Sequence, residues 1–421
     1  MIARGSVRVP GDKSVSHRVL MLAATTDGPC ELGGVLAAGD TRATASCLRA
    51  LGARVGPLRG DTPVHVGGRG LGSFRAPARA LDCRNSGTTA RLLMGLLAAH
   101  AFECILTGDR SLRRRPMARV TEPLQRMGAR ITTTDGHLPV TVRGGRLKGL
   151  EYDSPVASAQ VKTCLLFAGL AAGVRVRVTE PVRSRDHTER LLQMLGARCE
   201  VRGRAVTLEA VERLPAFDGT VPGDFSSAAY LLAAGLLAES GRLTVQGVGV
   251  NPTRTGFLRA VERMGGVIDV SDEAESLGEP IASLTPRTSH LAPVVVAPEE
   301  VPSMVDEIPL LACLAARAEG RSVFRGVGEL RVKESDRLAL VAKNLASLGV
   351  RAESEGDTLY VEGTDRPPRG RIETAGDHRL AMAFAVLGTV KGARVELDDE
   401  RCVAISYPAF FRDLRAVLHR A

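Results

Sequence analysis

Apolar segments of helical length recur six times along the chain and form the clearest pattern in the sequence. Each is rich in alanine and leucine, and the six begin near Lys13, Thr88, Ser158, Phe225, Ile308 and His378. An amphipathic segment follows each one, and the first five amphipathic segments end in a glycine step that leads into a strand pattern. Self-similarity of this kind marks a chain built from one structural unit. The pattern therefore predicts six α/β repeats, each reading as strand, helix, strand, helix and strand, with a further strand at its end.

The chain divides at its midpoint, where a near-copy of its opening occurs. The segment VPGDKS at Val9–Ser14 returns as VPGDFS at Val221–Ser226. These two Pro-Gly turns predict a middle domain of residues 10–222 and a discontinuous domain of residues 1–9 plus 223–421, with three repeats in each. Two domains are the expected number for a chain of 421 residues.

Two further predictions concern the joints between these domains. The crossings near residues 10–11 and 222–223 contain glycine, so we expect them to act as hinges. The sixth repeat stops at its second helix, and the N-terminal strand at Gly5–Pro10 is predicted to complete it.

The composition is typical of a soluble globular protein, with 44% hydrophobic and 24% charged residues. The longest apolar runs fall short of the ~18 residues expected of a membrane helix. The N-terminus carries no apolar leader segment. Eight cysteines are scattered without a CxxC motif or a Cys/His cluster, which favours reduced, buried thiols over disulfides or a metal site. We therefore expect a cytoplasmic protein that binds neither a membrane nor a metal.

The net charge of +9 raises the possibility of a nucleic-acid partner. However, the chain has no tryptophan, only 3% aromatic residues to stack on bases, and one basic run, RSLRRRP at Arg110–Pro116. A site for small anions explains the positive balance equally well. A nucleic-acid-binding repeat protein therefore stays only a remote alternative.

Polar and charged residues gather at the predicted starts of the helices. They are Lys13, Ser14 and Arg18; Asn85 to Thr89; Arg113 to Pro116; Ser158 and Gln160; Arg185 to His187; Asp306 and Glu307; Lys333 to Arg337; and Asp377 to Arg379. A cation at a helix N-terminus opposes the helix dipole, but an anion held between that N-terminus and a nearby Arg or Lys satisfies both. If the repeats are equivalent in structure, these helix ends converge on a shared face in each domain. Two such faces would form a cleft for small polyanions.

Six motifs in order along the chain resemble those of one enzyme family. They are PGDKSVSHR at Pro10–Arg18, NSGTTARL at Asn85–Leu92, RRRPM at Arg113–Met117, SAQVK at Ser158–Lys162, RVKESDR at Arg331–Arg337 and GDHRLAM at Gly376–Met382. Together they are similar to the 5-enolpyruvylshikimate-3-phosphate synthase (3-phosphoshikimate 1-carboxyvinyltransferase) family. The resemblance implies an α/β fold: a two-domain inside-out α/β barrel with six βαβαββ repeats, three per domain.

The resemblance also implies the reaction. The enolpyruvyl group of phosphoenolpyruvate would pass to the 5-hydroxyl of shikimate 3-phosphate by addition and elimination, with release of phosphate, in the shikimate pathway of aromatic amino acid biosynthesis. Two small anionic substrates are expected, with no cofactor and no metal, in a monomeric cytoplasmic enzyme that glyphosate inhibits.

The family's functional residues can be matched to positions of this sequence. Those matched to phosphoenolpyruvate binding are Lys13, Asn85, Gly87, Arg115, Gln160, Arg337 and Arg379. Those matched to shikimate 3-phosphate are Lys13, Ser14, Arg18, Ser158, Gln160, Arg185, Asp306 and Lys333. The resemblance implies a general base at Asp306 and proton handling by Glu334 and Lys13, and it places His378 at the site.

The sequence also departs from the family pattern. Ala159 stands where many members have a second serine, Val182 where some have tyrosine, and Ile405 where others have lysine. An alternative with the same fold is a UDP-N-acetylglucosamine enolpyruvyl transferase. Many of those enzymes carry a cysteine in the loop before the Arg-Pro step, and here no cysteine lies between Cys104 and Cys164.

Overall fold

The computed structural model describes residues 1–60 and 62–419 and divides the chain into two compact units. The middle unit comprises Gly11–Pro222 and Glu275–Glu279. The terminal unit comprises Met1–Pro10, Gly223–Ala274 and the chain from Pro280 onward. The predicted boundaries did not separate Glu275–Glu279. This segment joins the middle unit because Leu277 packs into that unit's hydrophobic core and Glu279 accepts a hydrogen bond from His187.

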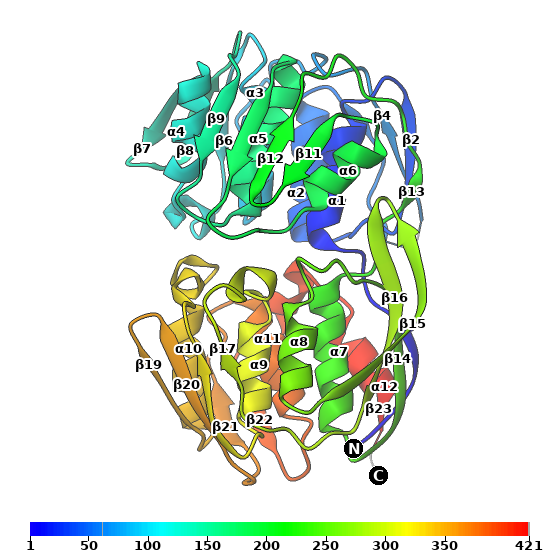
Figure 1. Cartoon of the computed structure of the whole chain (residues 1–421), viewed down its shortest axis with the longest axis vertical. Coiled ribbons are helices and arrows are strands. Elements are labelled where there is room, and N and C mark those ends of the chain that lie inside the picture. Colours follow the sequence, from blue (N-terminus) through cyan, green and yellow to red (C-terminus); the bar gives the residue numbers. More distant parts are fainter. Residues whose placement is uncertain (61, 420–421) are drawn as a thin grey trace. The chain divides into compact units, whose positions relative to one another are not determined.

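The middle unit holds three repeats in sequence order (Figure 1). The first contains α1 (Lys13–Ala23), β2 (Pro29–Gly33), α2 (Gly39–Ala50), β3 (Arg54–Val55) and β4 (Val64–Gly67). The second contains β5 (Leu81–Asp82), α3 (Gly87–Leu97), β6 (Glu103–Thr107), η1 (Leu112–Arg114), α4 (Ala118–Met127), β7 (Arg130–Thr134) and β8 (His137–Arg143). The third contains β9 (Leu150–Asp153), α5 (Ala159–Ala172), β10 (Val176–Thr179), α6 (His187–Met194), β11 (Cys199–Arg202) and β12 (Ala205–Leu208).

The terminal unit repeats the same order. Its first repeat contains α7 (Phe225–Leu237), β14 (Ser240–Gly249), α8 (Gly256–Arg263), β15 (Val267–Ser276) and β16 (Glu279–Arg287). Its second contains β17 (Val295–Val296), η2 (Val301–Ser303), α9 (Ile308–Ala315), β18 (Gly320–Phe324), η3 (Gly328–Val332), α10 (Arg337–Ser347), β19 (Arg351–Glu355) and β20 (Thr358–Gly363). Its third contains β21 (Arg369–Ile372), α11 (His378–Leu387), β22 (Arg394–Leu397), η4 (Arg401–Ile405), α12 (Phe410–Val417) and β23 (Leu418–His419).

The sheets share one topology. In the orders β5-β6-β8-β7, β9-β10-β12-β11 and β17-β18-β20-β19, the first two strands are parallel and the others antiparallel. A helix connects the two parallel strands, as such a connection requires. The βαβαββ repeat predicted for the chain is therefore present, and the sixth repeat retains the parallel pair β21-β22.

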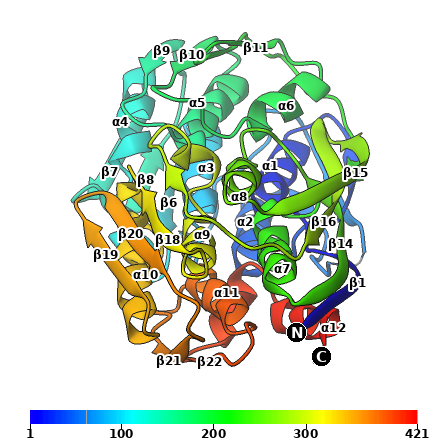
Figure 2. The same cartoon turned by 60° about the horizontal axis from the view of Figure 1, so that its bottom comes forward.

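In each unit, one strand from a distant part of the sequence completes the first repeat. β13 (Gly219–Thr220) pairs in parallel with β2, and β1 (Ile2–Arg8) pairs in parallel with β14, where Figure 2 shows it in dark blue. The prediction that the N-terminal strand completes the sixth repeat was right only in part. β1 occupies the first-strand position of the fourth repeat, although it also pairs with β23 at the chain end.

The two Pro-Gly turns follow these strands directly. Asp12 N donates to Pro222 O over 2.7 Å, and Asp224 N donates to Pro10 O over 2.8 Å. The side chain of Asp12 then caps α1, and that of Asp224 caps α7. The repeated VPGD sequence thus makes the same turn twice, and each turn starts the first helix of a three-repeat set.

The first helix of each repeat lies in the core of its unit. Among them, α5, α7 and α9 are apolar on nearly all sides, so burial on all sides stabilises them, whereas α4, α8 and α12 bury one apolar face. Gly95 of α3 permits close packing against α5, because a Cβ atom there would lie 2.1 Å from the carbonyl oxygen of Cys164. Each unit has its own hydrophobic core, and this packing fixes the positions of the helix N-termini.

Candidate active site

The N-termini of α1, α3 and α5 come together in the middle unit. Asp12, Ser86 and Ser158 cap these helices by accepting hydrogen bonds from the backbone N–H groups of Val15, Thr89 and Val161. Hydroxyl groups link the neighbouring helices, because Thr44 Oγ1 of α2 lies 2.7 Å from Thr89 Oγ1 of α3 and 2.6 Å from His17 Nδ1 of α1. The helix ends of the middle unit therefore converge, as the repeat pattern predicted.

Lys13 begins α1 and is held by a carboxylate of the next helix. Its Nζ lies 3.3 Å from Asp40 Oδ2, and the two side chains are 15% and 11% exposed. Because some of the ammonium surface stays accessible, Lys13 can still approach an anionic ligand. Burial, followed by the charges of Lys13 and Arg18, holds the pKa of the neighbouring His17 well below its usual value, so this imidazole is neutral.

Arg115 is oriented by neutral groups. Its Nη2 donates to Asn85 Oδ1 over 2.8 Å, and Asn85 Nδ2 in turn donates to Asp109 Oδ2 over 2.7 Å. Asp109 also caps η1 by accepting from Leu112 N. Asn85 therefore appears in the structure as a link between Asp109 and the guanidinium of Arg115.

Gly87, the first residue of α3, lies beside two guanidinium groups. A Cβ atom there would lie 2.7 Å from Arg91 Nη1 and 3.5 Å from Arg115 Nη1. Arg91 Nη1 donates to Gln160 Oε1 over 2.8 Å, and Gln160 Nε2 donates to Thr88 Oγ1 over 3.0 Å. The absence of a side chain at Gly87 thus leaves room for both arginines. Sequence reasoning missed Arg91, whose position within NSGTTARL was the available signal.

Arg18 lies deeper in the middle unit and is nearly inaccessible. It donates to the carbonyl of Ser14, to Thr163 Oγ1 and to Thr188 Oγ1 over 2.8–2.9 Å. Burial lowers the pKa of Arg18 to about 10. Arg185 is half-buried in the loop before α6 and is close enough to act electrostatically on Arg18. Ser14 is half-buried in the first turn of α1.

The terminal unit gathers its charges around Arg337, which is 1% exposed. Arg337 Nε donates to Asp377 Oδ2 over 2.7 Å, Nη1 lies 3.4 Å from Asp306 Oδ1, and Nη2 donates to Glu334 Oε2. Burial opposes the charge of Arg337, but these carboxylates outweigh it and raise its pKa above the usual value. One guanidinium thus contacts three carboxylates from different segments.

Asp306 is shared by two arginines. Arg379 Nε lies 3.4 Å from Asp306 Oδ1, the same oxygen that faces Arg337. Lys333 pairs with Glu329 over 3.7 Å, and burial lowers the pKa of Lys333 despite the opposing charges of Asp306 and Glu329. The structure therefore brings together Asp306, Glu334, Lys333, Arg337 and Arg379, all of which the sequence analysis singled out.

A second buried ion pair anchors the turn that carries Asp306. Glu307 is 1% exposed, and its Oε2 lies 3.0 Å from Arg254 Nη1; Ser226 Oγ also donates to Glu307. His378 is fully buried at the start of α11. Sequence reasoning missed Arg254, because NPTRTG gives no local hint that its arginine reaches Glu307.

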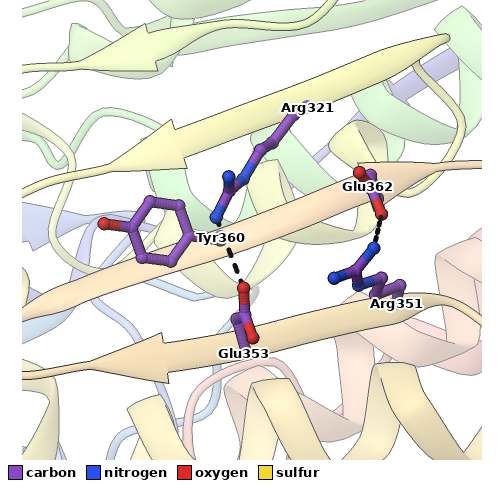
Figure 3. Close-up of a pocket in the computed structure, with 5 residues that line it drawn as sticks. All are labelled: Arg321, Arg351, Glu353, Tyr360 and Glu362. Atoms are coloured by element: carbon purple, nitrogen blue, oxygen red, sulfur yellow. Dashed lines mark hydrogen bonds and ion pairs between the residues drawn. The ribbon is translucent and has the colours of Figure 1, made fainter.

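A shallow pocket on the β18-β20-β19 sheet contains none of the predicted site residues (Figure 3). Arg321 packs over the ring of Tyr360, 4.3 Å from its centre, and pairs with Glu353 over 3.3 Å. Arg351 pairs with Glu362 over 3.1 Å. Each charge has a cross-strand partner, so this surface is explained by strand pairing.

Comparison with known proteins now identifies the family. The sequence profile of EPSP synthase (3-phosphoshikimate 1-carboxyvinyltransferase) matches residues 3–414. The chain is similar to the 3-phosphoshikimate 1-carboxyvinyltransferase of Gloeobacter violaceus, with 48% identity over 98% of this chain and 96% of the relative. It is 49% identical to the enzyme of the same name from Thermus thermophilus, again over 98% of this chain and 96% of the relative.

The chain belongs to the EPSP synthase family. A solved EPSP synthase from Acinetobacter baumannii superposes with a TM-score of 0.88 at 39% identity, covering 99% of this chain and 96% of that one. An enolpyruvyl transferase, NikO, from Streptomyces tendae superposes with a TM-score of 0.80 over 99% of this chain and 95% of that one, but at 21% identity it supports the fold alone.

Family membership confirms two predictions from the sequence: the enzyme class and the two-domain α/β fold. It favours EPSP synthase over the UDP-N-acetylglucosamine enolpyruvyl transferases and over a nucleic-acid-binding protein. Across residues 1–60 and 62–419, no helix has the length and apolar character needed to cross a membrane. The same stretches contain no cluster of three or more His, Cys, Asp or Glu side chains that could hold a metal ion.

Proposed function

We propose that the chain transfers the enolpyruvyl group of phosphoenolpyruvate to the 5-hydroxyl of shikimate 3-phosphate and releases inorganic phosphate. In the addition step, the hydroxyl oxygen forms a bond to C2, its proton passes to a base, and C3 gains a proton. In the elimination step, the bond from C2 to the phosphate oxygen breaks and C3 loses a proton. Both substrates are anions, so cations must orient them and neutralise their charge.

The middle unit supplies cations for this task. We assign phosphoenolpyruvate binding to Lys13, Asn85, Gly87, Arg115 and Gln160, because Gly87 leaves open the space beside Arg91 and Arg115. Preorganised donors of this kind act without reorganisation when charge develops.

The same unit is proposed to hold shikimate 3-phosphate. Its contacts are assigned to Lys13, Ser14, Arg18, Ser158, Gln160 and Arg185. A phosphate at the N-terminus of a helix beside an arginine is a favourable arrangement. Arg18 is nearly inaccessible and donates hydrogen bonds to Ser14, Thr163 and Thr188. Within this set, we therefore propose that Arg18 acts mainly by holding these segments in position around the phosphate.

The terminal unit supplies groups for proton transfer. Asp306 is proposed as the base for the 5-hydroxyl, and Glu334, with Lys13 of the middle unit, as the group that handles the C3 proton. Arg337 and Arg379 both pair with Asp306 and so hold it in place, and they are proposed to contact phosphoenolpyruvate. Lys333 and His378 complete this set.

The observation that carries the proposal is the position of Asp306 between two buried arginines and close to Glu334, since Arg337 contacts both carboxylates. The test is phosphate release from phosphoenolpyruvate with either shikimate 3-phosphate or UDP-N-acetylglucosamine. We expect turnover only with shikimate 3-phosphate. Turnover only with the UDP-sugar would overturn the proposal.

The proposal also includes the oligomeric state of the chain and its location in the cell. The charged exterior and the reduced, buried state of all eight cysteines support a monomer that acts in the cytoplasm. Light scattering coupled to size exclusion checks the first property, and localisation of a tagged chain checks the second. A dimer at assay concentrations would contradict the monomer.

A further inference from the structure

Glu180 is a buried carboxylate at the end of β10 that accepts four hydrogen bonds. Its Oε1 accepts from Ser158 N over 3.0 Å and from Ser184 Oγ over 2.6 Å. Its Oε2 accepts from Lys162 Nζ over 2.9 Å and from Ser184 N over 3.2 Å. The side chain is 2% exposed. With about four lone-pair positions on a carboxylate, all of its accepting capacity is used.

These donors come from the two segments that carry proposed ligands of shikimate 3-phosphate. Ser158 caps α5, and its hydroxyl accepts a long hydrogen bond of 3.4 Å from Val161 N. Within residues 1–60 and 62–419 no acceptor is recorded for the hydroxyl proton, so it can serve a ligand. Ser184 directly precedes Arg185 in the loop before α6. Glu180 therefore joins the start of α5 to the loop of Arg185.

The loop is fixed on both sides of Arg185. Ser184 is bound to Glu180 through its backbone and its side chain. On the other side, Asp186 accepts from Arg190 Nε over 3.0 Å. The backbone of Glu180 is itself tied, because its N–H donates to Arg204 O over 3.0 Å. Arg185, which is half-buried, thus extends from a loop whose conformation is set without a ligand.

Lys162 provides the counter-charge and also binds a second carboxylate. Its Nζ lies 2.9 Å from Glu180 Oε2 and 2.7 Å from Glu189 Oε1, and all three side chains are 2% exposed. Glu189 contacts neither Ser158 nor Ser184 in the described interactions, and its Oε2 has no hydrogen-bond partner. The two carboxylates thus share burial and the same ammonium, but only Glu180 reaches the ligand-bearing segments.

We propose that Glu180 is a positioning residue for shikimate 3-phosphate, which holds the α5 N-terminus at Ser158 and the loop of Arg185 ready for the phosphate group. A helix N-terminus and an arginine are both anion-binding elements. If these elements are ordered before the substrate binds, binding does not have to include the conformational-entropy cost of ordering them. This inference rests on the proposed function, because Ser158 and Arg185 are assigned there to shikimate 3-phosphate.

The test compares Glu180→Gln with Glu189→Gln in the full-length chain. In Glu180→Gln an amide NH₂ group must face N–H or O–H donors, so the contacts to Ser158 and Ser184 cannot all form. We expect the Kd for shikimate 3-phosphate, measured by calorimetry, to rise at least ~10-fold. The Kd for shikimate, which lacks the phosphate, should change by less than ~3-fold, and kcat at saturation should change little.

Glu189→Gln is the matched control. It makes the same substitution beside the same lysine and at the same burial, but touches neither segment. Its Kd for shikimate 3-phosphate should stay within ~2-fold of wild type. Equal losses in the two variants would overturn the inference, because the cluster would then act only through general stability. Equal losses for shikimate and shikimate 3-phosphate would overturn it too.

A milder variant covers the case in which Glu180→Gln does not fold. Ser184→Ala removes only the donor at 2.6 Å and keeps the pair between Lys162 and Glu180. It should weaken shikimate 3-phosphate by ~3- to 10-fold and leave shikimate unchanged; unchanged binding of both would refute the positioning role. Phosphate release by the wild type is measured in the same series. Its absence would count against the proposed function, whereas normal release with unaffected variants counts only against Glu180.

Discussion

The two units hold several of their arginines in different ways. In the terminal unit, Arg337 contacts three carboxylates and Arg379 shares one of them. In the middle unit, Arg18 donates to two hydroxyls and a carbonyl, and Arg91 donates to an amide and a carbonyl. Neutral partners orient a guanidinium without cancelling its charge. These two arginines of the middle unit therefore keep their charge for an anion, whereas Arg337 and Arg379 hold carboxylates of the terminal unit in place.

This difference separates two roles of a lysine or arginine that a sequence motif cannot distinguish: attracting an anionic ligand and holding a carboxylate in place. Lysines and arginines occur in the motifs of both units, yet a positive field at a ligand survives only where the partners are neutral or few. A carboxylate can act as a base only where it stays charged and aligned. Substitutions that change one charge at a time can test whether the two units differ in this way.

Asp306→Asn should have the largest effect, a loss of ~10²–10⁴ in kcat, because the amide keeps the shape but cannot take the proton of the 5-hydroxyl. Steady-state phosphate release checks this. Asp336→Asn is the control, since Asp336 caps α10 through Ala339 N and asparagine retains that role. A kcat for Asp306→Asn within ~3-fold of wild type would remove Asp306 from the proton transfer.

Lys13→Met should lower kcat/KM by ~10²–10³, the usual value of a preorganised charge at a reacting centre. Arg113→Met is its control, because Arg113 is exposed and its side chain donates to Thr107 Oγ1, a neutral group. We expect the control to stay within ~2-fold of wild type. If both variants lose activity equally, the effect comes from overall charge and the assignment of Lys13 fails.

Arg337→Met and Arg18→Met compare the loss of unfolding free energy when an arginine with carboxylate partners or one with neutral partners is removed. Loss of Arg337 leaves Asp306, Glu334 and Asp377 without their common cation, which should cost about 3–5 kcal/mol of unfolding free energy. Loss of Arg18 leaves only neutral groups without a donor and should cost about 1–3 kcal/mol. Urea denaturation measures both. Equal losses would mean that the charge of the partners does not matter.

Gly87→Ala should raise the KM for phosphoenolpyruvate by ~10-fold or less, because its methyl group would displace the flexible end of Arg91 and contact that of Arg115. Glyphosate, which is longer than the substrate, should lose more affinity than phosphoenolpyruvate in inhibition assays. Gly39→Ala is the control, since a Cβ there meets nothing within 4 Å. Equal changes for the inhibitor and the substrate would refute the role of Gly87 in selecting ligand length.

Glu189→Gln should have the smallest effect, and it should depend on pH. Burial raises the pKa of Glu189 above its ordinary 4.5, so the folded protein binds that proton more tightly than the unfolded chain. Wild type has this contribution to stability below pH 4.5 and loses it as pH rises through the raised pKa. The unfolding free energy of the variant minus that of wild type should therefore increase from pH 4 to pH 8. A constant difference would show that Glu189 does not titrate on folding.

The amino-acid sequence by itself determined the repeats and most of the candidate residues. Apolar periodicity is a local property, so the first helices at Lys13, Gly87 and Phe225 begin within one residue of their predicted starts. The charged helix starts and the family resemblance likewise identified Asp306, Glu334 and Arg337, which the structure brings together. The predicted hinges and the roles of the site residues stay predictions.

Only the tertiary structure decided which partners these residues have. Contacts such as Ser158 N to Glu180, Arg91 to Gln160 and Arg254 to Glu307 join segments from different parts of the chain. The N-terminal strand pairs with β14 as well as with β23 of the sixth repeat, because strand pairing depends on sheet edges that only the folded units provide. A helix start can be recognised from its own residues, but a buried charge is stabilised by whatever the fold places beside it.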